Sequence, residues 1–195
     1  ARSIKIMGIK HAVITSVDRD DLPDQGTIIW TETVQAIRRM NPNTTLETLI
    51  PDFQGQEHLL DRIVEVAPEV VSHNMETVRL LTREVRIQAK YDRSLEALRY
   101  LKQQGVNRTK SGLMLGLGES EEEVIASMED LRNANVDIIT LGQYLQPSKK
   151  HLPVADFITP EQFGKYEALG LEMGFRHVES GALVRSSYKA HKHIA

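Results

Sequence analysis

The chain has 195 residues, of which 26% are charged, a formal net charge of -3 and no cysteine. A chain of this length forms one domain or a large part of one, and its charge does not suggest a nucleic-acid or polybasic membrane surface. The longest apolar runs have the length of strands, so we expect a soluble protein that binds neither nucleic acid nor membrane. Without cysteine, the written sequence has no disulfide and no thiolate chemistry.

The first third of the chain is predicted to alternate between helices and strands. An apolar segment ending at Gly8 has the pattern of a last helical turn, so we expect the chain to begin inside an element and a further segment to precede it. A buried strand is predicted over 9–17, a helix over 27–40 and a strand over 44–50. The charged run 18–21 fits either a solvated loop or the rim of an active site.

The same alternation continues to the end. Helices are predicted over 56–67, 78–81, 91–104, 121–131 and 160–173, and strands over 69–72, 109–115, 136–141 and 177–180. Two capping-box patterns, Ser120 with Glu123 and Thr159 with Gln162, mark helix starts. Six strands with a helix in nearly every connection predict an α/β fold of parallel strands with right-handed helical crossovers. We expect a partial (β/α) barrel, with a doubly wound sheet as the alternative.

The stretch 109–124 is the one around which the chain is organised. An apolar strand ends in Gly116-Leu117-Gly118-Glu119, and a capped helix follows, which is where α/β proteins place ligands. The stretch lacks the Lys-Ser/Thr of a phosphate loop and the glycine spacing of a dinucleotide site. Its glycines can also be purely structural, because they let neighbouring elements approach the strand.

Other polar residues near strand ends leave two interpretations open. The run His73-Asn74-Met75-Glu76-Thr77 follows the predicted strand 69–72 and fits a ligand site or a simple helix cap. An ordinary barrel enzyme could also use carboxylates as acid–base groups, although no ordered nucleophile–base pair is visible. The candidates for that role are Asp18, Asp20, Glu76 and Glu119.

Five motifs occur in the order found in one enzyme family. They are Ser16-Val17-Asp18-Arg19-Asp20-Asp21-Leu22, His73-Asn74-Met75-Glu76-Thr77, the run from Lys110 to Glu119, Gly142-Gln143-Tyr144-Leu145-Gln146-Pro147-Ser148, and Arg185-Ser186-Ser187-Tyr188 with Ala190. Within the third, Gly112-x-Met114-x-Gly116-x-x-Glu119 resembles a strand motif of radical S-adenosylmethionine (SAM) enzymes. Together the five motifs span the chain and resemble those of the lipoyl synthases.

This resemblance implies a partial barrel over 1–183, with its first βα unit missing, and a tail over 184–195. It implies that SAM is cleaved reductively to a 5′-deoxyadenosyl radical and that sulfur from a second iron–sulfur cluster enters C6 and C8 of a protein-bound octanoyl chain. The implied cofactors are SAM and two [4Fe-4S] clusters. The implied partners are octanoylated lipoyl domains of 2-oxoacid dehydrogenases or the glycine-cleavage H protein, and an electron donor such as ferredoxin or flavodoxin. The implied location is a bacterial cytoplasm or an organellar matrix.

The resemblance also implies site residues. Those expected to bind SAM are Ser16, Asp18, Asn74, Glu76, Lys110, Gly112, Met114 and Leu145. Ser16 and Asp18 would face the methionyl amine, because an ammonium needs acceptors. Asn74 and Glu76 would face the ribose, and the bare Gly112 backbone with Leu145 would face adenine. Ser186 is expected to be an oxygen ligand of the second cluster.

The sequence departs from the family in its cysteines. The family carries two cysteine triads, and iron–sulfur clusters are held by thiolates, so we expect the chain as written to be inactive. We interpret it as a fragment that lacks an upstream cysteine segment. The alternative is a catalytically inactive barrel that still binds SAM or a lipoyl-carrier protein. Without a cluster, the tail from Ser186 onward is expected to be disordered or folded over the barrel mouth.

Overall fold

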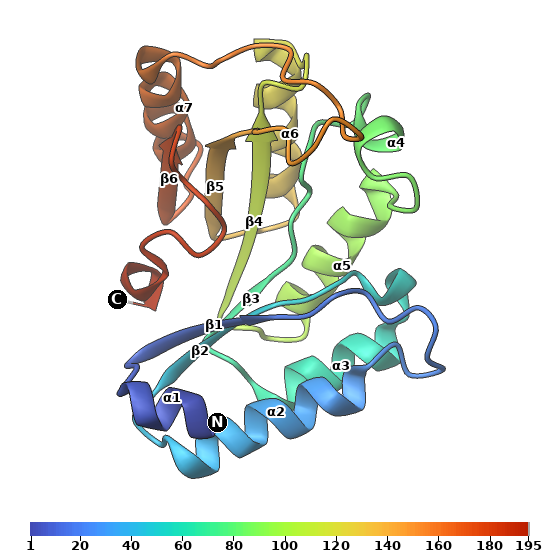
Figure 1. Ribbon diagram of the computed structural model, residues 1–195, viewed down its shortest axis with the longest axis vertical. Coiled ribbons are helices and arrows are strands. Elements are labelled where there is room, and N and C mark those ends of the chain that lie inside the picture. The colour runs from blue at the N-terminus through green and yellow to red at the C-terminus, as the bar shows by residue number, and fades with distance from the viewer. Residues whose placement is uncertain (195) are drawn as a thin grey trace.

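The computed structural model describes residues 1–194, which form a six-stranded parallel sheet with helical crossovers (Figure 1). The strands are β1 (His11–Thr15), β2 (Thr45–Leu49), β3 (Val70–Ser72), β4 (Arg108–Leu115), β5 (Ile138–Gln143) and β6 (His177–Gly181). Their order in the sheet equals their order in the chain, and all five pairings are parallel. This order is that of a barrel wall and not of a doubly wound sheet, so the predicted fold class is confirmed.

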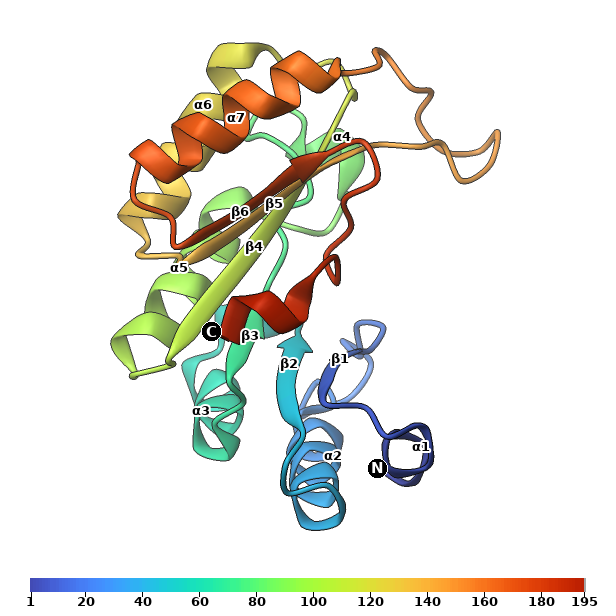
Figure 2. The ribbon, with the colours of Figure 1, turned by 90° about the vertical axis from the view of Figure 1, so that its left-hand side faces the viewer.

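Helices α2, α3, α5, α6 and α7 lie on the convex side of the curved sheet (Figure 2). The helical elements are α1 (Arg2–Met7), α2 (Thr27–Met40), η1 (Phe53–Gly55), α3 (Glu57–Val66), α4 (Thr82–Val85), α5 (Tyr91–Gln103), α6 (Glu121–Asn133), α7 (Pro160–Glu172) and η2 (Ala190–Ile194). Apolar clusters fill the layer between helices and sheet, and one of them joins β4 and β5 to α6 and α7. None of the helices within 1–194 combines the length and apolar character needed to cross a membrane.

Both predicted helix starts form, the one at α6 as a full capping box and the one at α7 with the hydroxyl cap alone. At α6 the Ser120 hydroxyl accepts a hydrogen bond from the Glu123 amide at 3.3 Å, and the Glu123 carboxylate accepts one from the Ser120 amide at 2.7 Å. At α7 the Thr159 hydroxyl accepts from the Gln162 amide at 3.1 Å. These bonds satisfy amides that the first helical turn leaves without partners. The glycine turn and helix that follow β4 are therefore confirmed.

The helix predicted over 78–81 is wrong, because the helical turn begins only at Thr82. The chain after β3 stays paired with β4 as far as Glu76, whose amide donates to the Gly112 carbonyl at 2.9 Å. The Glu76 carbonyl in turn accepts from the Met114 amide at 2.8 Å. Pairing with β4 thus continues past the predicted strand and displaces the helix toward the C-terminus. The strand predicted over 9–17 is also shorter, covering only His11–Thr15.

The chain after β6 turns back and crosses the concave side of the sheet before ending in η2 (Figure 2). Ala190 and His193 of η2 are buried, and the His193 ring lies 5.5 Å from the His177 ring at the start of β6. The tail is therefore folded, as one of the two predicted outcomes had it, but it lies inside the open half-barrel and not over its mouth. Its two ends face different places: Arg185 and Ser186 lie near the carboxyl ends of the strands, and η2 lies against β1.

Candidate functional site

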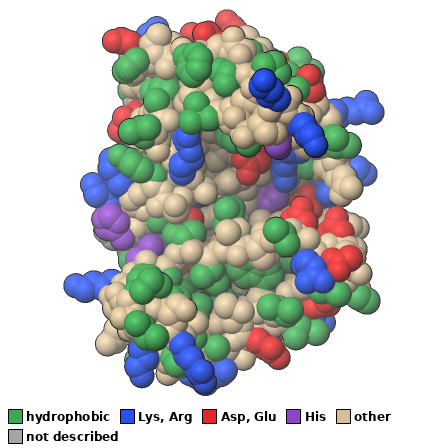
Figure 3. Space-filling model, in the orientation of Figure 1, with side chains coloured by type: hydrophobic (Ala, Val, Ile, Leu, Met, Phe, Trp, Pro, Cys, Tyr) green, Lys and Arg blue, Asp and Glu red, His purple; other side chains and the backbone are tan. Residues whose placement is uncertain are grey.

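A cleft of about 460 Å³ opens at the carboxyl ends of the strands, between β4, β5 and the tail. Figure 3 shows the hollowed middle of this face, with acidic and basic side chains along it. The cleft has the size of a small-molecule site. Six of the predicted site residues line it: Asn74, Glu76, Gly112, Met114, Leu145 and Ser186.

A second hollow of about 210 Å³ adjoins the cleft and shares Leu49, Asn74 and Glu76 with it. Ser16 and Asp18, which follow β1, line this hollow. The structure therefore brings all the predicted site residues except Lys110 to one edge of the sheet, as expected for the carboxyl ends of parallel strands. Their roles toward a ligand remain predictions.

Asn74 and Glu76 form a polar pair on the floor shared by the two hollows. The Asn74 side-chain amide donates to Glu76 Oε1 at 3.1 Å, while Asn74 Oδ1 is buried with no hydrogen-bond partner among residues 1–194. Burial raises the pKa of the Glu76 carboxyl, and the Asn74 hydrogen bond opposes that rise. A buried acceptor without a partner is uncommon in a native protein, so these two side chains can accept hydrogen bonds from a ligand.

Gly112 lies beside this pair, where the Cβ atom of any other residue would be crowded. A Cβ atom at Gly112 would lie 2.6 Å from Thr140 Oγ1 and 3.2 Å from Asn74 Oδ1. Both are closer than carbon and oxygen approach without a shift of the backbone or of buried side chains. The β4 backbone is thus bare at the wall of the cleft, which leaves a flat surface for a ligand.

Gln143, at the end of β5, shapes the loop that forms another wall. Its Nε2 donates to the Tyr144 and Asp156 carbonyls, both at 3.0 Å, and its Oε1 accepts from the Ile158 amide at 2.9 Å. The loop that begins with Leu145 is therefore tied to the sheet at both of its ends. The sequence analysis missed this role, and its only signal is a polar residue at the end of an otherwise apolar strand.

Glu119 is occupied within the glycine turn. Its Oε1 accepts from the Gly116 amide at 2.5 Å and its Oε2 from the Leu117 amide at 2.9 Å. Both oxygens therefore stabilise the turn, which leaves the acid–base interpretation without one of its four carboxylates. Asp18 is the other notable member of that set, because burial and, next, the nearby Asp20 raise its pKa.

His73 has a structural place although its neighbours face the cleft. Its Nδ1 lies 2.9 Å from the Ile50 carbonyl and its Nε2 lies 2.8 Å from Ser94 Oγ. Burial lowers its pKa to about 4, so the ring is neutral near pH 7. With both nitrogens hydrogen-bonded, His73 fixes the end of β3 and has no ring nitrogen left for a ligand.

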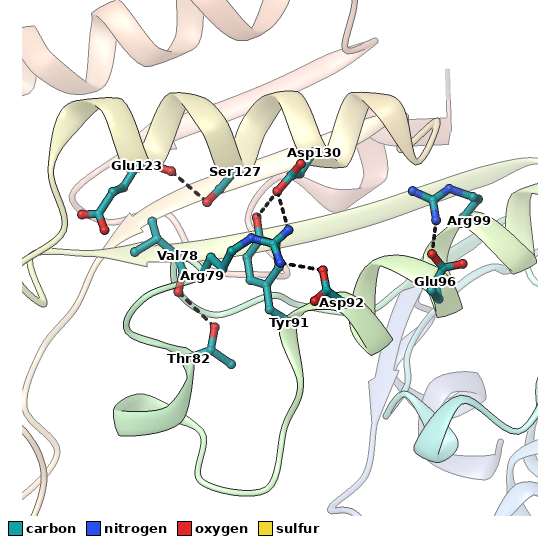
Figure 4. Close-up of polar contacts among 10 residues, drawn as sticks. All are labelled: Val78, Arg79, Thr82, Tyr91, Asp92, Glu96, Arg99, Glu123, Ser127 and Asp130. Carbon is teal, nitrogen blue, oxygen red and sulfur yellow. Dashed lines mark hydrogen bonds and ion pairs between the residues drawn. The ribbon is translucent and has the colours of Figure 1, made fainter.

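Two arginines hold the segment around Glu76. The Arg86 guanidinium donates to the carbonyls of Asn74 at 3.1 Å and Met75 at 3.3 Å. Arg79 lies 4.2 Å over the Tyr91 ring and bridges Asp92, at 2.5 Å, and Asp130, at 3.1 Å (Figure 4). The Arg79 contacts join the residues after Glu76 to α5 and α6, and the Arg86 contacts hold the residues just before it.

The site fits a nucleoside but not an iron–sulfur cluster. The orphaned Asn74 oxygen and the bare backbone at Gly112 suit a ligand with hydroxyls and a flat ring. Residues 1–194 contain no cysteine, and no three of their His, Asp or Glu side chains are arranged to bind a metal ion. Because clusters are held by thiolates, these residues do not hold one on their own. Ser186, half-buried at the cleft, could contribute a single oxygen.

Solved structures share the fold at low sequence identity. Methylornithine synthase aligns with a TM-score of 0.65 and 19% identity over 95% of this chain and 61% of its own. A maturase of the [FeFe]-hydrogenase aligns with a TM-score of 0.72 and 15% identity over 99% of this chain and 45% of its own. At these identities the likeness concerns the fold alone.

Sequence comparison identifies the family. Residues 1–131 match the radical SAM superfamily. The chain is 80% identical over 194 residues to the lipoyl synthase of Flavobacterium johnsoniae and 79% identical to the mitochondrial lipoyl synthase of Nematostella vectensis. Each comparison covers 100% of this chain and 67% of the relative, so the chain spans about two thirds of the length of these curated relatives. The chain therefore belongs to the lipoyl synthase family of the radical SAM superfamily.

Proposed function

We propose that the enzyme containing this chain is a lipoyl synthase that binds SAM in the cleft at the carboxyl ends of β4 and β5. It inserts sulfur at C6 and C8 of a protein-bound octanoyl group. The observation that supports the proposal most strongly is the 80% identity to a lipoyl synthase over the whole chain. The aligned region covers all the residues that line the cleft. SAM, when bound and reduced, supplies the 5′-deoxyadenosyl radical that removes hydrogen from the octanoyl chain.

In this proposal the residues of the chain bind and orient SAM. Asn74 and Glu76 accept hydrogen bonds from the ribose hydroxyls, because both side chains line the cleft and carry oxygen acceptors, of which the buried Asn74 Oδ1 has no other partner among residues 1–194. The adenine lies against the backbone at Gly112 and Met114, under the half-exposed side chain of Leu145.

The methionyl end of SAM is assigned to the adjoining hollow. Ser16 and Asp18 line it and supply acceptors for the ammonium group. Burial already raises the pKa of Asp18, because it disfavours the charged carboxylate. A bound ammonium group would stabilise that carboxylate. Lys110 is also a predicted cofactor residue, but it lies outside both hollows.

The remaining cofactors and partners follow from the family. Two [4Fe-4S] clusters need thiolates that the written sequence does not contain, and we assign Ser186 as one oxygen ligand of the second cluster. Oxygen binds cluster iron more weakly than thiolate does, which suits a cluster that is dismantled for its sulfur. The acceptor is an octanoylated lipoyl domain or H protein, and the electron donor is of the ferredoxin or flavodoxin type.

Titration calorimetry with SAM on the full-length enzyme tests the nucleoside assignment. Glu76→Ala should weaken SAM binding by about tenfold, as expected when a charged hydrogen-bond partner is removed. Glu84→Ala, an exposed glutamate on α4, removes the same charge outside the cleft and should leave the affinity within about twofold, as for surface substitutions in general. Equal affinities of the two variants would contradict the assignment.

The ligand assignment needs a separate comparison. Ser186→Ala should lower the lipoyl product formed per SAM cleaved, whereas Ser187→Ala, on a more exposed residue, should lower it less. Equal product ratios for Ser186→Ala and wild type would contradict it.

A further inference from the structure

A buried ion pair lies below the cleft, on the concave side of the sheet, and the proposed SAM site does not use it. Lys110 of β4 and Glu47 of β2 both have fully buried side chains, and Lys110 Nζ lies 2.8 Å from Glu47 Oε1. We propose that Lys110 is a positioning residue that fixes the tail backbone at Ser186, and thereby sets where this serine lies at the cleft.

The contacts of Lys110 lead directly to the tail. Its Nζ donates to the Ser186 carbonyl at 2.5 Å, across 76 positions of sequence, and lies 3.4 Å from His193 Nδ1 in η2. An ammonium group has three donors and no acceptor, so one bond to Glu47 leaves donors for the tail. Glu47 is held in turn, because its Oε1 also accepts from Ser72 Oγ at 2.6 Å. The tail is thus joined through Lys110 to β2, β3 and β4.

The tail has few other polar anchors as strong as this one. Lys189 pairs with Glu179 of β6 at 3.3 Å, but the Lys189 side chain is 41% exposed and the pair is screened by solvent. Buried Ala190 and His193 hold η2 by packing. Lys110 therefore holds the stretch between β6 and η2 by a charged hydrogen bond to the Ser186 carbonyl. Ser186 is also the residue whose side chain is to be positioned.

A second lysine of the chain forms an ion pair but does not contact the tail. Lys102 of α5 lies 2.7 Å from Asp137 Oδ2 and donates to the Asn107 carbonyl at 2.9 Å. This pair also joins separate elements, and the Asp137 side chain is only 8% exposed. Its partners all lie away from the tail. Lys102 is therefore a matched control for loss of an ion-paired lysine.

The inference rests on the proposed role of Ser186 only for its catalytic consequence. The Ser186 carbonyl and side chain share one Cα, so fixing the carbonyl limits the positions that the hydroxyl can reach. Without this hydrogen bond the hydroxyl would sample several positions at the cleft. The structural claim that Lys110 orders the tail stands apart from what Ser186 binds, and the two are measured separately.

Hydrogen exchange of the full-length enzyme tests the structural claim. Glu47→Gln keeps the Lys110 donor and the acceptor for Ser72, whereas Glu47→Gln with Lys110→Met removes the donor without leaving a buried charge. Exchange at the amides of Tyr188, Ala190 and Lys192 should be about tenfold faster or more in the double variant than in Glu47→Gln, as expected for loss of a charged hydrogen bond. Lys102→Met should not accelerate exchange there. Equal tail exchange in the Glu47→Gln and double variants would overturn the proposal.

The product ratio tests the positioning role itself, because a loss of folded enzyme lowers both products together. In the double variant, lipoyl product formed per 5′-deoxyadenosine should fall about tenfold relative to Glu47→Gln, in step with the loosened tail. The ratio in Lys102→Met should equal that of wild type. A loosened tail with an unchanged ratio would overturn the positioning role. If Ser186→Ala also leaves the ratio unchanged, the ligand assignment fails, whereas an effect of Ser186→Ala alone places the failure with Lys110.

Discussion

Glu47 and Glu76 are two glutamates inside the same half-barrel with opposite surroundings. Glu47, in the middle of β2, is fully buried and paired with the ammonium of Lys110. Glu76, at the carboxyl ends, forms no ion pair within residues 1–194 and has the Asn74 amide as its hydrogen-bond donor. The charge of Glu47 is compensated within the protein, although its Oε2 is buried without a hydrogen-bond partner among residues 1–194. Glu76 lies beside a cleft without an ion pair, and Arg86 acts on it only at longer range, so its carboxylate is available to a ligand.

The surroundings differ because of the tail. Below the cleft, η2 and the backbone of Ser186 cover the ion pair, so water and ligands are excluded from it. At the carboxyl ends, the first residues of the tail form one wall of the cleft and do not fill it. Asn74, Glu76 and Gly112 therefore line an open space. One short segment thus closes one half of the lumen and borders the other, which makes its position important for both.

The largest expected effect comes from breaking the ion pair on one side. Lys110→Met leaves Glu47 buried and unpaired and should lower the free energy of unfolding by about 3–5 kcal/mol. Glu76→Gln, which removes a carboxylate that forms no ion pair within residues 1–194, should change it by less than about 1 kcal/mol. Urea unfolding of both variants measures this difference. Adding Glu47→Gln to Lys110→Met should restore most of the loss, and a failure to do so would mean that the charge imbalance is not its cause.

The next effect sharpens the picture of the cleft wall. Gly112→Ala places a Cβ 2.6 Å from Thr140 Oγ1, so it should destabilise the protein by about 1–3 kcal/mol and weaken SAM binding. Gly164→Ala is the matched control, because Gly164 lies within α7 with no atom within 4 Å of the added Cβ. That change should stabilise the protein by about 0.5–1 kcal/mol through helix propensity. Thermal unfolding and SAM titration of the pair measure both effects; two destabilised variants would contradict the packing argument.

The parts of the molecule that sequence predicts best are those set by local patterns. The strand, glycine turn and capped helix around Gly116 and Ser120 depend on residues a few positions apart, and all three form as predicted. The gathering of Asp18, Asn74 and Gly112 at one edge also follows from local patterns, because parallel strands place their carboxyl ends together.

What sequence could not predict depends on distant partners. The Lys110 ammonium meets Ser186 only after four further elements have folded between them, and β4 is buried on both faces, so it shows no alternation that would reveal a lysine inside the half-barrel. The helix expected over 78–81 failed for a similar reason. Pairing of Glu76 with β4, a partner more than 35 positions away, outweighed the local preference for a helix.

The pH dependence of stability separates the two carboxylates further. Burial raises the folded-state pKa of Glu76 above its ordinary value of 4.5, so the folded protein holds this proton more tightly than the unfolded chain. As pH rises from about 4.5 through the raised pKa, the unfolded chain loses the proton first, and the free energy of unfolding should fall across this window. Glu76→Gln cannot titrate, so its stability relative to wild type should increase with pH. Urea unfolding of both proteins between about pH 4.5 and 8 measures this difference, in which shared titrations cancel. Parallel profiles would contradict the assigned environment.

The smallest expected effect concerns how firmly the open, ligand-facing segment is held. Arg79 bridges Asp92 of α5 and Asp130 of α6 and lies over Tyr91, whereas the one ion pair of Arg99 among residues 1–194 is with Glu96, one helical turn away (Figure 4). The Arg79 side chain is 48% exposed, so solvent screening limits the effect of Arg79→Met to about 0.5–1 kcal/mol. Arg99→Met should lie within about 0.5 kcal/mol of wild type, because an isolated pair within one helix contributes little. Loosening the segment that carries Asn74 and Glu76 should also weaken SAM binding in Arg79→Met by a few-fold and leave it unchanged in Arg99→Met. Thermal unfolding with SAM titration measures both quantities, and equal behaviour of the two arginine variants would show that the segment is held by its pairing with β4 alone.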